Sequence, residues 1–197
     1  MKQYIKQTET GIRFFRNPLK AGNGDTIYNP PHERLLAEGW VEYTPTLEEA
    51  RTEKLAELEA AFDTASREAH CTSSVGFEID ADETANRNIE GLVLVMQPEE
   101  TTLFRAYDNT FHEVTREQLE TMRKEIVVNS QYLYQAKWTM EARIKAAETT
   151  EALKIIVVTP GTLEELANSF MNTAAGETET EDTNETNTQE ETSTETD

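Results

Sequence analysis

The side chains best suited to chemistry in this sequence are its carboxylates. Two adjacent acid pairs, Glu48–Glu49 and Glu99–Glu100, carry the residue type that a general acid and base require. Their surroundings indicate a helix surface and a turn, where carboxylates are normally solvated. Abundant acids at such places do not define a site, so we expect neither pair to be catalytic.

Metal ligands are few and scattered along the chain. The best ligands for transition metals are one cysteine and three histidines, namely Cys71, His32, His70 and His112. They cannot supply the usual four ligands of a structural zinc site. Asp80, Asp82 and Glu83 have oxygens that suit weak calcium binding, but their spacing lacks the glycine and terminal glutamate of an EF-hand loop. We therefore expect no metal and no cofactor.

The motifs of the common enzyme classes are also missing from the sequence. The turn Gly22-Asn23-Gly24 is followed neither by lysine with serine or threonine nor by a helix, as a phosphate-binding loop would be. There is no zinc-protease helix motif, no nucleophile elbow and no Cys-x-x-Cys pair. The neighbours of His112 do not resemble a catalytic triad, and we interpret His112 as a surface or interface side chain. The sequence thus predicts a protein without enzymatic activity.

The chain is strongly acidic, and part of that charge lies at its end. It has 38 acidic and 18 basic residues, for a net charge of −20. Residues 176–197 hold nine of the acids and no basic or apolar side chain. Ordering costs roughly 1–2 kcal/mol per residue and nothing there offsets it, so we expect an acidic, disordered tail over 174–197. The other 29 acids still exceed the 18 bases by 11, which argues against binding nucleic acid.

The sequence predicts a soluble, intracellular protein that meets no membrane. Its single cysteine excludes an internal disulfide and fits a reducing compartment. The first residues lack the apolar run of a signal peptide. The apolar run Leu92–Met96 falls well short of the roughly 20 residues that span a bilayer.

Residues 1–45 predict a small unit that contains β-structure. Ile12–Phe15 is a candidate strand, and Thr26–Tyr28, after a glycine-rich turn, is its candidate hairpin partner. A short helix is expected over residues 32–38, ended by Gly39. The aromatic residues that follow favour a small sealed core, and a ligand platform is the alternative.

Two long helices are predicted from capping boxes and helical periodicity. Thr46 with Glu49 begins the first, and Thr115 with Gln118 begins the second, which runs to about Ala147. The apolar positions of the first helix alternate three and four apart, at Leu55, Leu58, Phe62, Ala65 and Ala69. Such a seam either packs within the chain, which we favour, or forms a coiled coil with another chain.

The second long helix carries a stripe that is either core, the interpretation we favour, or a partner-binding face. Its members are Leu119, Met122, Ile126, Leu133, Ala136, Met140 and Ile144. Asn129 stands where this stripe expects an apolar residue, and a polar residue at such a seam can fix the oligomeric state. Tyr132, Tyr134 and Trp138 widen the apolar face.

The period changes between and after the long helices. Residues 74–80 alternate like a half-buried strand, and residues 81–94 fit a short helix. Leu103–Tyr107 and Phe111–Val114 predict a hairpin. A further helical turn follows residue 149, and Thr159-Pro160-Gly161 separates it from a short terminal helix.

Together these patterns predict an α+β fold that is mostly helical. A small N-terminal β-containing unit precedes long helices that flank a short hairpin or meander, and an acidic disordered tail follows. The expected domains are 1–45, 46–158, the terminal helix 159–173 and the tail 174–197. No catalytic, cofactor or metal residue is assigned. The candidate interaction residues are Trp40, Tyr107, His112, Asn129, Tyr132, Tyr134 and Trp138.

Part of the sequence resembles a known family. Leu103–Thr115, with Leu133–Trp138 and Ile144–Ala147 downstream, is similar to a C-terminal domain of unknown function common in bacteriophages and prophages of gut bacteria. The resemblance covers roughly residues 52–158, and the N-terminal part resembles a short leader that often precedes this domain. No catalytic or ligand residue is assigned to the family, so the resemblance implies none here.

The genes of this family typically lie among tail, tail-fibre and baseplate genes. The resemblance therefore implies a non-enzymatic phage or prophage tail-associated protein. It would be a minor structural component of the tail tip, fibre or baseplate, or a tail-fibre assembly chaperone. Its partners would be phage tail or fibre proteins, and it would lie in the host cytoplasm during assembly and, as a component, in the virion tail.

The resemblance also implies an oligomeric state. Phage tail tips and fibres have threefold and sixfold symmetry, so a homo-oligomer is expected, a trimer ahead of a dimer.

The alternative function is an acidic host-directed inhibitor or DNA mimic, whose acidic surface is itself the active feature. Binding by a mimic would weaken steeply with salt, whereas an apolar tail interface would persist.

Overall fold

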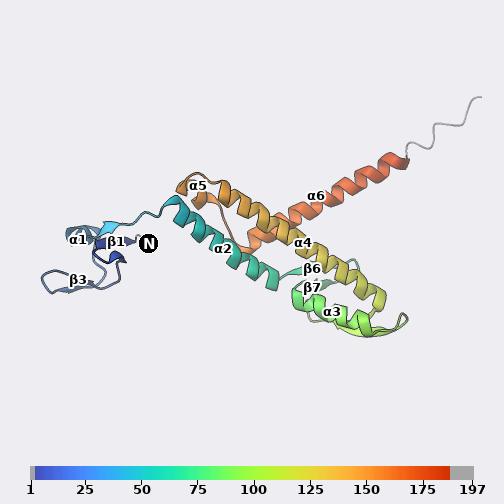
Figure 1. The fold of residues 1–197 in the computed structure, drawn as a ribbon. Helices are drawn as coiled ribbons and strands as arrows, with labels where there is room; N and C mark the ends of the chain where they lie inside the picture. Colours follow the sequence, from blue (N-terminus) through green and yellow to red (C-terminus); the bar gives the residue numbers. More distant parts are fainter. Residues whose placement is uncertain (1–2, 187–197) are drawn as a thin grey trace, which may run out of the picture. The chain divides into compact units, whose positions relative to one another are not determined.

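The structure is a computed structural model that describes residues 3–186, with side chains up to Ala174. It divides into two compact units, Met1–Ala50 and Arg51–Asp197. Most of the described chain is helical and each unit contains short strands, which confirms the predicted α+β, mostly helical class (Figure 1).

The first unit combines short strands with one helix. Its elements are β1 (Tyr4–Thr8), β2 (Gly11–Phe14), β3 (Leu19–Lys20), β4 (Thr26–Ile27), α1 (His32–Ala37) and β5 (Val41–Glu42). Strand β1 lies between β2 and β5 and pairs antiparallel with both, so that Ile5 faces Phe14 on one side and Val41 on the other. Strands β3 and β4 form a separate antiparallel pair.

The predicted pairing of residues 12–15 with 26–28 is wrong. Strand β2 pairs with β1, and β4 pairs with β3. The reason lies in the turn between β1 and β2, where Gly11 adopts a φ of 124° that other residues rarely adopt. There the hydroxyl of Thr8 donates to the carbonyl oxygen of Gly11 at 2.7 Å. This tight turn returns the chain onto β1 before the later glycine-rich turn is reached.

Aromatic side chains seal the core of the first unit, as the sequence favours. The buried members are Tyr4, Leu19 and Leu35, with Phe15, Ile27 and Trp40 packed against them. Trp40 meets Phe15 edge-on, with 5.4 Å between ring centroids. Helix α1 ends as predicted, because Gly39 takes a φ of 78° and the amide of Trp40 returns to the carbonyl of Leu35 at 3.0 Å.

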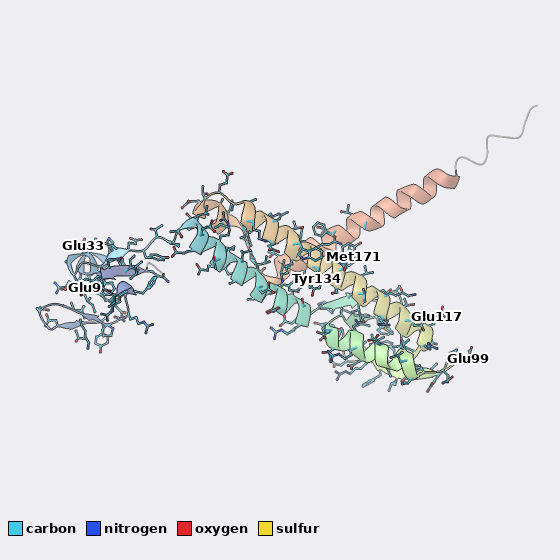
Figure 2. The ribbon with its side chains drawn as sticks, in the orientation of Figure 1. Glu9, Glu33, Glu99, Glu117, Tyr134 and Met171 are labelled. Atoms are coloured by element: carbon cyan, nitrogen blue, oxygen red, sulfur yellow. The ribbon has the colours of Figure 1, made fainter. Side chains whose placement is uncertain are left out.

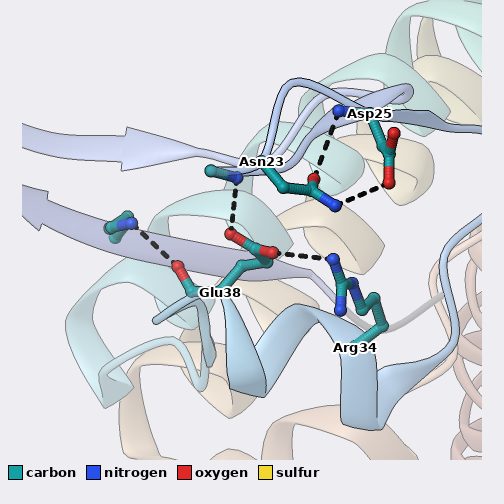
Figure 3. A network of polar contacts seen from close by, with 6 residues as sticks. Asn23, Asp25, Arg34 and Glu38 are labelled. Carbon is teal, nitrogen blue, oxygen red and sulfur yellow. Dashed lines mark hydrogen bonds and ion pairs between the residues drawn. The ribbon is translucent and has the colours of Figure 1, made fainter.

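The carboxylate of Glu38 ties the glycine-rich turn to α1 (Figure 3). One of its oxygens accepts a hydrogen bond from the amide of Gly22 at 3.1 Å, and the other lies 3.0 Å from the guanidinium of Arg34. Its backbone carbonyl accepts from the ammonium of Lys6 at 2.8 Å. These contacts fix a turn that has few apolar side chains of its own.

The second unit is built around one long helix. Its elements are α2 (Leu47–Arg67, which begins just before the boundary), β6 (His70–Thr72), β7 (Glu78–Asp80), α3 (Glu83–Val95), β8 (Thr101–Arg105), β9 (Phe111–Thr115), α4 (Arg116–Ala146), α5 (Thr150–Ile155) and α6 (Pro160–Thr186). The predicted hairpin of β8 with β9 is confirmed, and it pairs Phe104 with His112.

Helix α4 is the spine of this unit. Its capping box forms as predicted, with the hydroxyl of Thr115 accepting from the amide of Gln118 at 3.2 Å and the Gln118 side chain accepting from the amide of Thr115 at 2.9 Å. All seven residues of the predicted stripe are buried, none more than 5% exposed. The interpretation of that stripe as core is therefore confirmed.

Helix α3 and the two hairpins cover the first half of α4. Asp82 caps α3 as predicted, and its carboxylate accepts from the amide of Ala85 at 2.6 Å. The shared core contains Ile79, Ala81, Ile89, Val93, Met96, Val114, Leu119, Met122 and Ile126. The strand predicted over residues 74–80 is confirmed only at Glu78–Asp80, which form β7. The residues before it turn at Gly76, whose φ is 113°, and β7 pairs with β6 as a hairpin.

Helix α2 runs antiparallel along the second half of α4 (Figure 1). The guanidinium of Arg51, near the start of α2, donates to the carbonyl of Ala147 at 2.9 Å. Further along, Glu59 pairs with Lys137 at 2.7 Å. The α2 seam is buried at Leu58, Phe62 and Ala65, so it packs within the chain, as the sequence favours.

Helix α6 lies against the second half of α4 and buries Leu163 and Ala167. It begins at Pro160, where the missing amide hydrogen costs nothing, and the hydroxyl of Thr159 accepts from the amide of Thr162 at 3.1 Å. The helix continues to Thr186, past the predicted end at residue 173, because each added residue makes a further backbone hydrogen bond. Residues 187–197 of the predicted disordered tail lie outside the described residues.

Candidate functional site

Helix α4 carries a second stripe beside its buried one; this stripe is mainly apolar and faces outward. Its members, Val127, Gln131, Tyr134 and Trp138, are spaced four, three and four residues apart and so share one helical face. Val127 is 51% exposed, Tyr134 42% and Trp138 53%. We call these four residues the α4 surface stripe. Figure 2 labels Tyr134 near the middle of the helix.

The aromatic part of this stripe is held in place by neighbouring side chains. The ring of Tyr134 lies 4.9 Å from the ring of Phe62 on α2 and 5.9 Å from that of Trp138. The ammonium of Lys137 stands 4.4 Å over the ring of Phe62 and also pairs with Glu59. These contacts fix Tyr134 before any partner arrives, which lowers the entropy cost of binding there.

One groove opens where α2 ends and α3 begins, over the middle of α4. We call it the α2–α3–α4 groove, and its volume is about 730 Å³. Its apolar lining is Phe62, Ala69, Ala81, Ile126, Val127, Leu133 and Tyr134, and its polar lining is Asp63, Ser66, Arg67, Asp82, Glu83, Thr84, Asn86, Ser130 and Gln131. Val127, Gln131 and Tyr134 of the α4 surface stripe line this groove.

Several polar groups of this groove already have a partner. The Nε of Arg67 donates to the carbonyl of Asp63 at 3.0 Å, and Glu83 pairs with Arg87 at 2.9 Å. Asn86 is different, because its Oδ1 is buried and accepts no hydrogen bond from any residue that the structure describes. Buried acceptors are nearly always paired, so the donor to this atom is a water molecule or a group of another molecule.

A second groove of about 730 Å³ lies between α4 and α6. It is lined by Gln135, Trp138, Thr139, Ala142, Arg143, Ala146 and Phe170. Trp138 belongs both to this groove and to the α4 surface stripe. The stripe therefore connects the two grooves along one side of α4.

The structure separates the seven candidate interaction residues into several places. Tyr134 and Trp138 lie together on the α4 surface stripe, whereas Tyr132 on the same helix is half-buried. Asn129 lines a small cavity of about 90 Å³ together with Ala167 of α6, so it contacts its own chain. Trp40 belongs to the core of the first unit.

Tyr107 and His112 lie at the hairpins, each in a stacked ring pair. Tyr107 stacks on His70 with 4.4 Å between centroids, and His112 stacks on Phe77 with 4.0 Å. The ring of His112 also contacts the hydroxyl of Thr110 at 2.9 Å. These rings hold the two hairpins together and lie outside the grooves.

Asp63, Arg67 and Asn86 are among the groove residues that no sequence pattern singles out. Each looks like an ordinary solvated helix position, and only the meeting of three helices brings them to one place. Among the described residues, no three or more histidine, cysteine, aspartate or glutamate side chains are placed to share a metal ion.

Cys71 lies on β6, half-buried against the core beneath the hairpin. Burial, with added repulsion from Glu125 and Glu78, raises the pKa of its thiol from 9.0 to about 11. The thiolate is the reactive form, so two pKa units mean about 100-fold less of it at neutral pH. We expect iodoacetamide to alkylate Cys71 in the folded chain about 100-fold more slowly than in the denatured chain. Mass spectrometry measures the two rates. Equal rates would contradict this assignment.

The second unit is thus an α+β, mostly helical domain with two grooves along α4. Residues 49–157 match the family model described as Domain of unknown function (DUF4376). The match covers more than half of the chain, and the chain belongs to this family. The family domain spans α2 to α5, and the resemblance found over residues 52–158 is confirmed as membership of a domain-of-unknown-function family.

Comparisons with curated proteins and with solved structures found no significant match. Within the described residues, none of the helices combines the length and the apolar content needed to cross a bilayer.

Proposed function

We propose that this chain is a non-enzymatic phage or prophage tail-associated protein that acts by binding another protein. It serves as a minor structural component of the tail tip, fibre or baseplate, or as a chaperone for tail-fibre assembly. The observation that carries the binding function is the α4 surface stripe, where exposed aromatic rings connect two grooves. The tail association rests on the sequence resemblance to a family of phage and prophage proteins.

The composition of the stripe supports a protein partner. Tyrosine and tryptophan are enriched at the centres of protein interfaces, because each buries a large area and loses few rotamers. Tyr134 and Trp138 stand 42% and 53% exposed on a rigid helix, with grooves on both sides to receive side chains. A partner that covers them gains apolar contact without reshaping the domain.

Co-purification with tail proteins tests this function. The tagged chain is expressed with the tail, fibre and baseplate proteins of the phage or prophage that encodes it, and captured at low and high ionic strength. We expect one of them to be retained in both conditions, because apolar contacts resist salt. Trp138→Asp is expected to abolish that retention.

Phe111→Asp is the matched control, since Phe111 is also an exposed aromatic residue, at 63%, but lies on β9 outside both grooves. It is expected to retain the tail protein. Failure to capture any tail protein would contradict the proposal. Capture of a basic host protein that salt abolishes and Trp138→Asp leaves unchanged would favour the acidic inhibitor or DNA mimic instead.

A further inference from the structure

We propose that the α2–α3–α4 groove binds a basic, amphipathic helix of a protein partner. This inference rests on the partner-binding function proposed above and specifies the chemistry of the partner. It begins from the shape of the groove, which lies between the end of α2 and the start of α3 and has α4 as its floor. An open groove with an apolar lining is the geometry in which an amphipathic helix places its apolar face.

The apolar lining gives the partner helix its anchor positions. Phe62 comes from α2, and Ile126, Val127, Leu133 and Tyr134 come from α4. Val127 and Tyr134 are 51% and 42% exposed and lie two helical turns apart on one face. Two apolar side chains about two turns apart on the partner helix match this spacing.

The charges of the groove decide the polar side of the partner. The lining contains three carboxylates, those of Asp63, Asp82 and Glu83, and one guanidinium, that of Arg67. Glu83 also pairs with Arg87, which lies outside the lining, and Asp82 caps α3. Arg67 is drawn back along its own helix by its hydrogen bond to the Asp63 carbonyl. The groove is therefore negative, as is the chain that surrounds it, and it attracts lysine or arginine side chains.

The same charges exclude other occupants. A nucleic acid or an anionic lipid surface presents phosphates, which these carboxylates repel. A second copy of this chain carries the same net charge of −20 and would bring acid against acid. A basic segment is the occupant whose charge complements the groove.

The buried oxygen of Asn86 provides an independent reason for a donor-bearing partner. Asn86 lines the groove, and its buried Oδ1 has no hydrogen-bond partner among the described residues. Lysine and arginine side chains are donors without an acceptor, so either one supplies the missing hydrogen bond once the Asn86 amide turns toward the groove. The groove therefore offers a basic side chain carboxylates for its charge and an amide oxygen for its N–H group.

The test uses the full chain and two labelled helical peptides of equal length. Both carry leucine at the same amphipathic positions, and their polar positions are lysine in one and glutamate in the other. Fluorescence anisotropy measures the Kd of each peptide. We expect the lysine peptide to bind at least 10-fold more tightly than the glutamate peptide, with an affinity that falls as salt rises.

Two variants locate the binding. Asp63→Asn with Glu83→Gln removes two negative charges from the groove and is expected to weaken the lysine peptide about 10-fold. The matched control, Glu99→Gln with Glu148→Gln, removes the same charge from exposed residues outside the groove and is expected to change Kd less than 2-fold. Asn86→Ala is expected to weaken the lysine peptide several-fold, and circular dichroism melting checks that each variant folds.

Several outcomes would overturn the inference. Equal weakening by groove and control variants would show diffuse attraction to an acidic chain. Equal affinity for both peptides, or no affinity for the lysine peptide, would remove the charge argument. Self-association of the chain that Asp63→Asn strengthens would identify a second copy as the occupant.

The inference and the proposed function fail separately. Lysine-peptide binding that depends on the groove, without capture of any tail protein, would leave this site and contradict the tail function. Capture of a tail protein that Asp63→Asn with Glu83→Gln does not weaken would do the reverse.

Discussion

Replacing Leu133 with aspartate is expected to leave the second unit unfolded or molten. Leu133 is only 5% exposed, and it lies on α4 where α2 and α6 both reach the spine. Two basic groups line the cavities beside it. His70 already pairs with Glu78 at 2.6 Å, and the Nε of Arg67 already donates to the carbonyl of Asp63 at 3.0 Å. An unpaired carboxylate buried there costs several kcal/mol, which is a large share of the stability of a typical domain.

The expected result is loss of the cooperative melting transition, measured by circular dichroism, or loss of the protein from the soluble fraction. Val128→Asp is the matched control on the same helix, because Val128 is 48% exposed and its carboxylate would stay in water. Leu133→Met should cost less than about 1.5 kcal/mol, because it conserves volume. A folded Leu133→Asp variant with a normal melting temperature would mean that this stripe is not the core.

The second large effect is expected at Glu125, which joins α4 to the β6–β7 turn. Its carboxylate accepts from the hydroxyl of Ser73 at 2.5 Å and from the amide of Ser74 at 2.9 Å. Ser73 is only 2% exposed, so its hydroxyl has little access to water. Glu125→Ala leaves this donor unpaired, and hydrogen bonds to a charged group contribute about 1.5–3 kcal/mol. We expect a loss of about 2 kcal/mol in urea unfolding.

The same contacts make the stability of the fold depend on pH. Partial burial acts to raise the pKa of Glu125, but the hydrogen bonds from Ser73 and Ser74 outweigh it and hold that pKa below its ordinary value of 4.5. A lowered folded pKa means that the stabilisation is complete above pH 4.5 and is lost as the pH falls through the folded pKa.

We therefore expect the urea midpoint of Glu125→Gln to fall less than that of the parent as the pH is lowered below 4.5. Glu99→Gln, at an exposed position, controls for the loss of one charge. Parallel pH profiles for the parent and Glu125→Gln would show that Glu125 does not carry this dependence.

The sequence predicts the helices of the second unit well because their signals are local. A capping box needs two residues three apart, and the α4 stripe repeats over many turns, so both Thr115 and the buried face are found without tertiary information. Strand pairing is different. The β1–β5 pair joins Ile5 to Val41 across the whole first unit, and no local pattern specifies that partner.

The site is predicted only in part for the same reason. Tyr134 and Trp138 can be recognised in the sequence because they are aromatic residues beside the apolar stripe of a predicted helix. Their exposure depends on how far α2, α3 and α6 cover α4, and this tertiary packing is not specified by the local sequence. Asp63 and Asn86 come from different helices, so only the folded structure shows that they line the same groove.

The hydrogen bond from Arg51 to Ala147 has a consequence for how this domain is used as a module. It brings together two residues 96 apart in sequence, close to the first and last residues of the family match over 49–157. A domain whose ends meet occupies a single attachment point on its neighbours. The segment before α2 can therefore be exchanged without breaking the α2–α4 contacts, whereas the segment after Ala147 cannot, because α6 packs on α4 and buries Leu163 and Ala167.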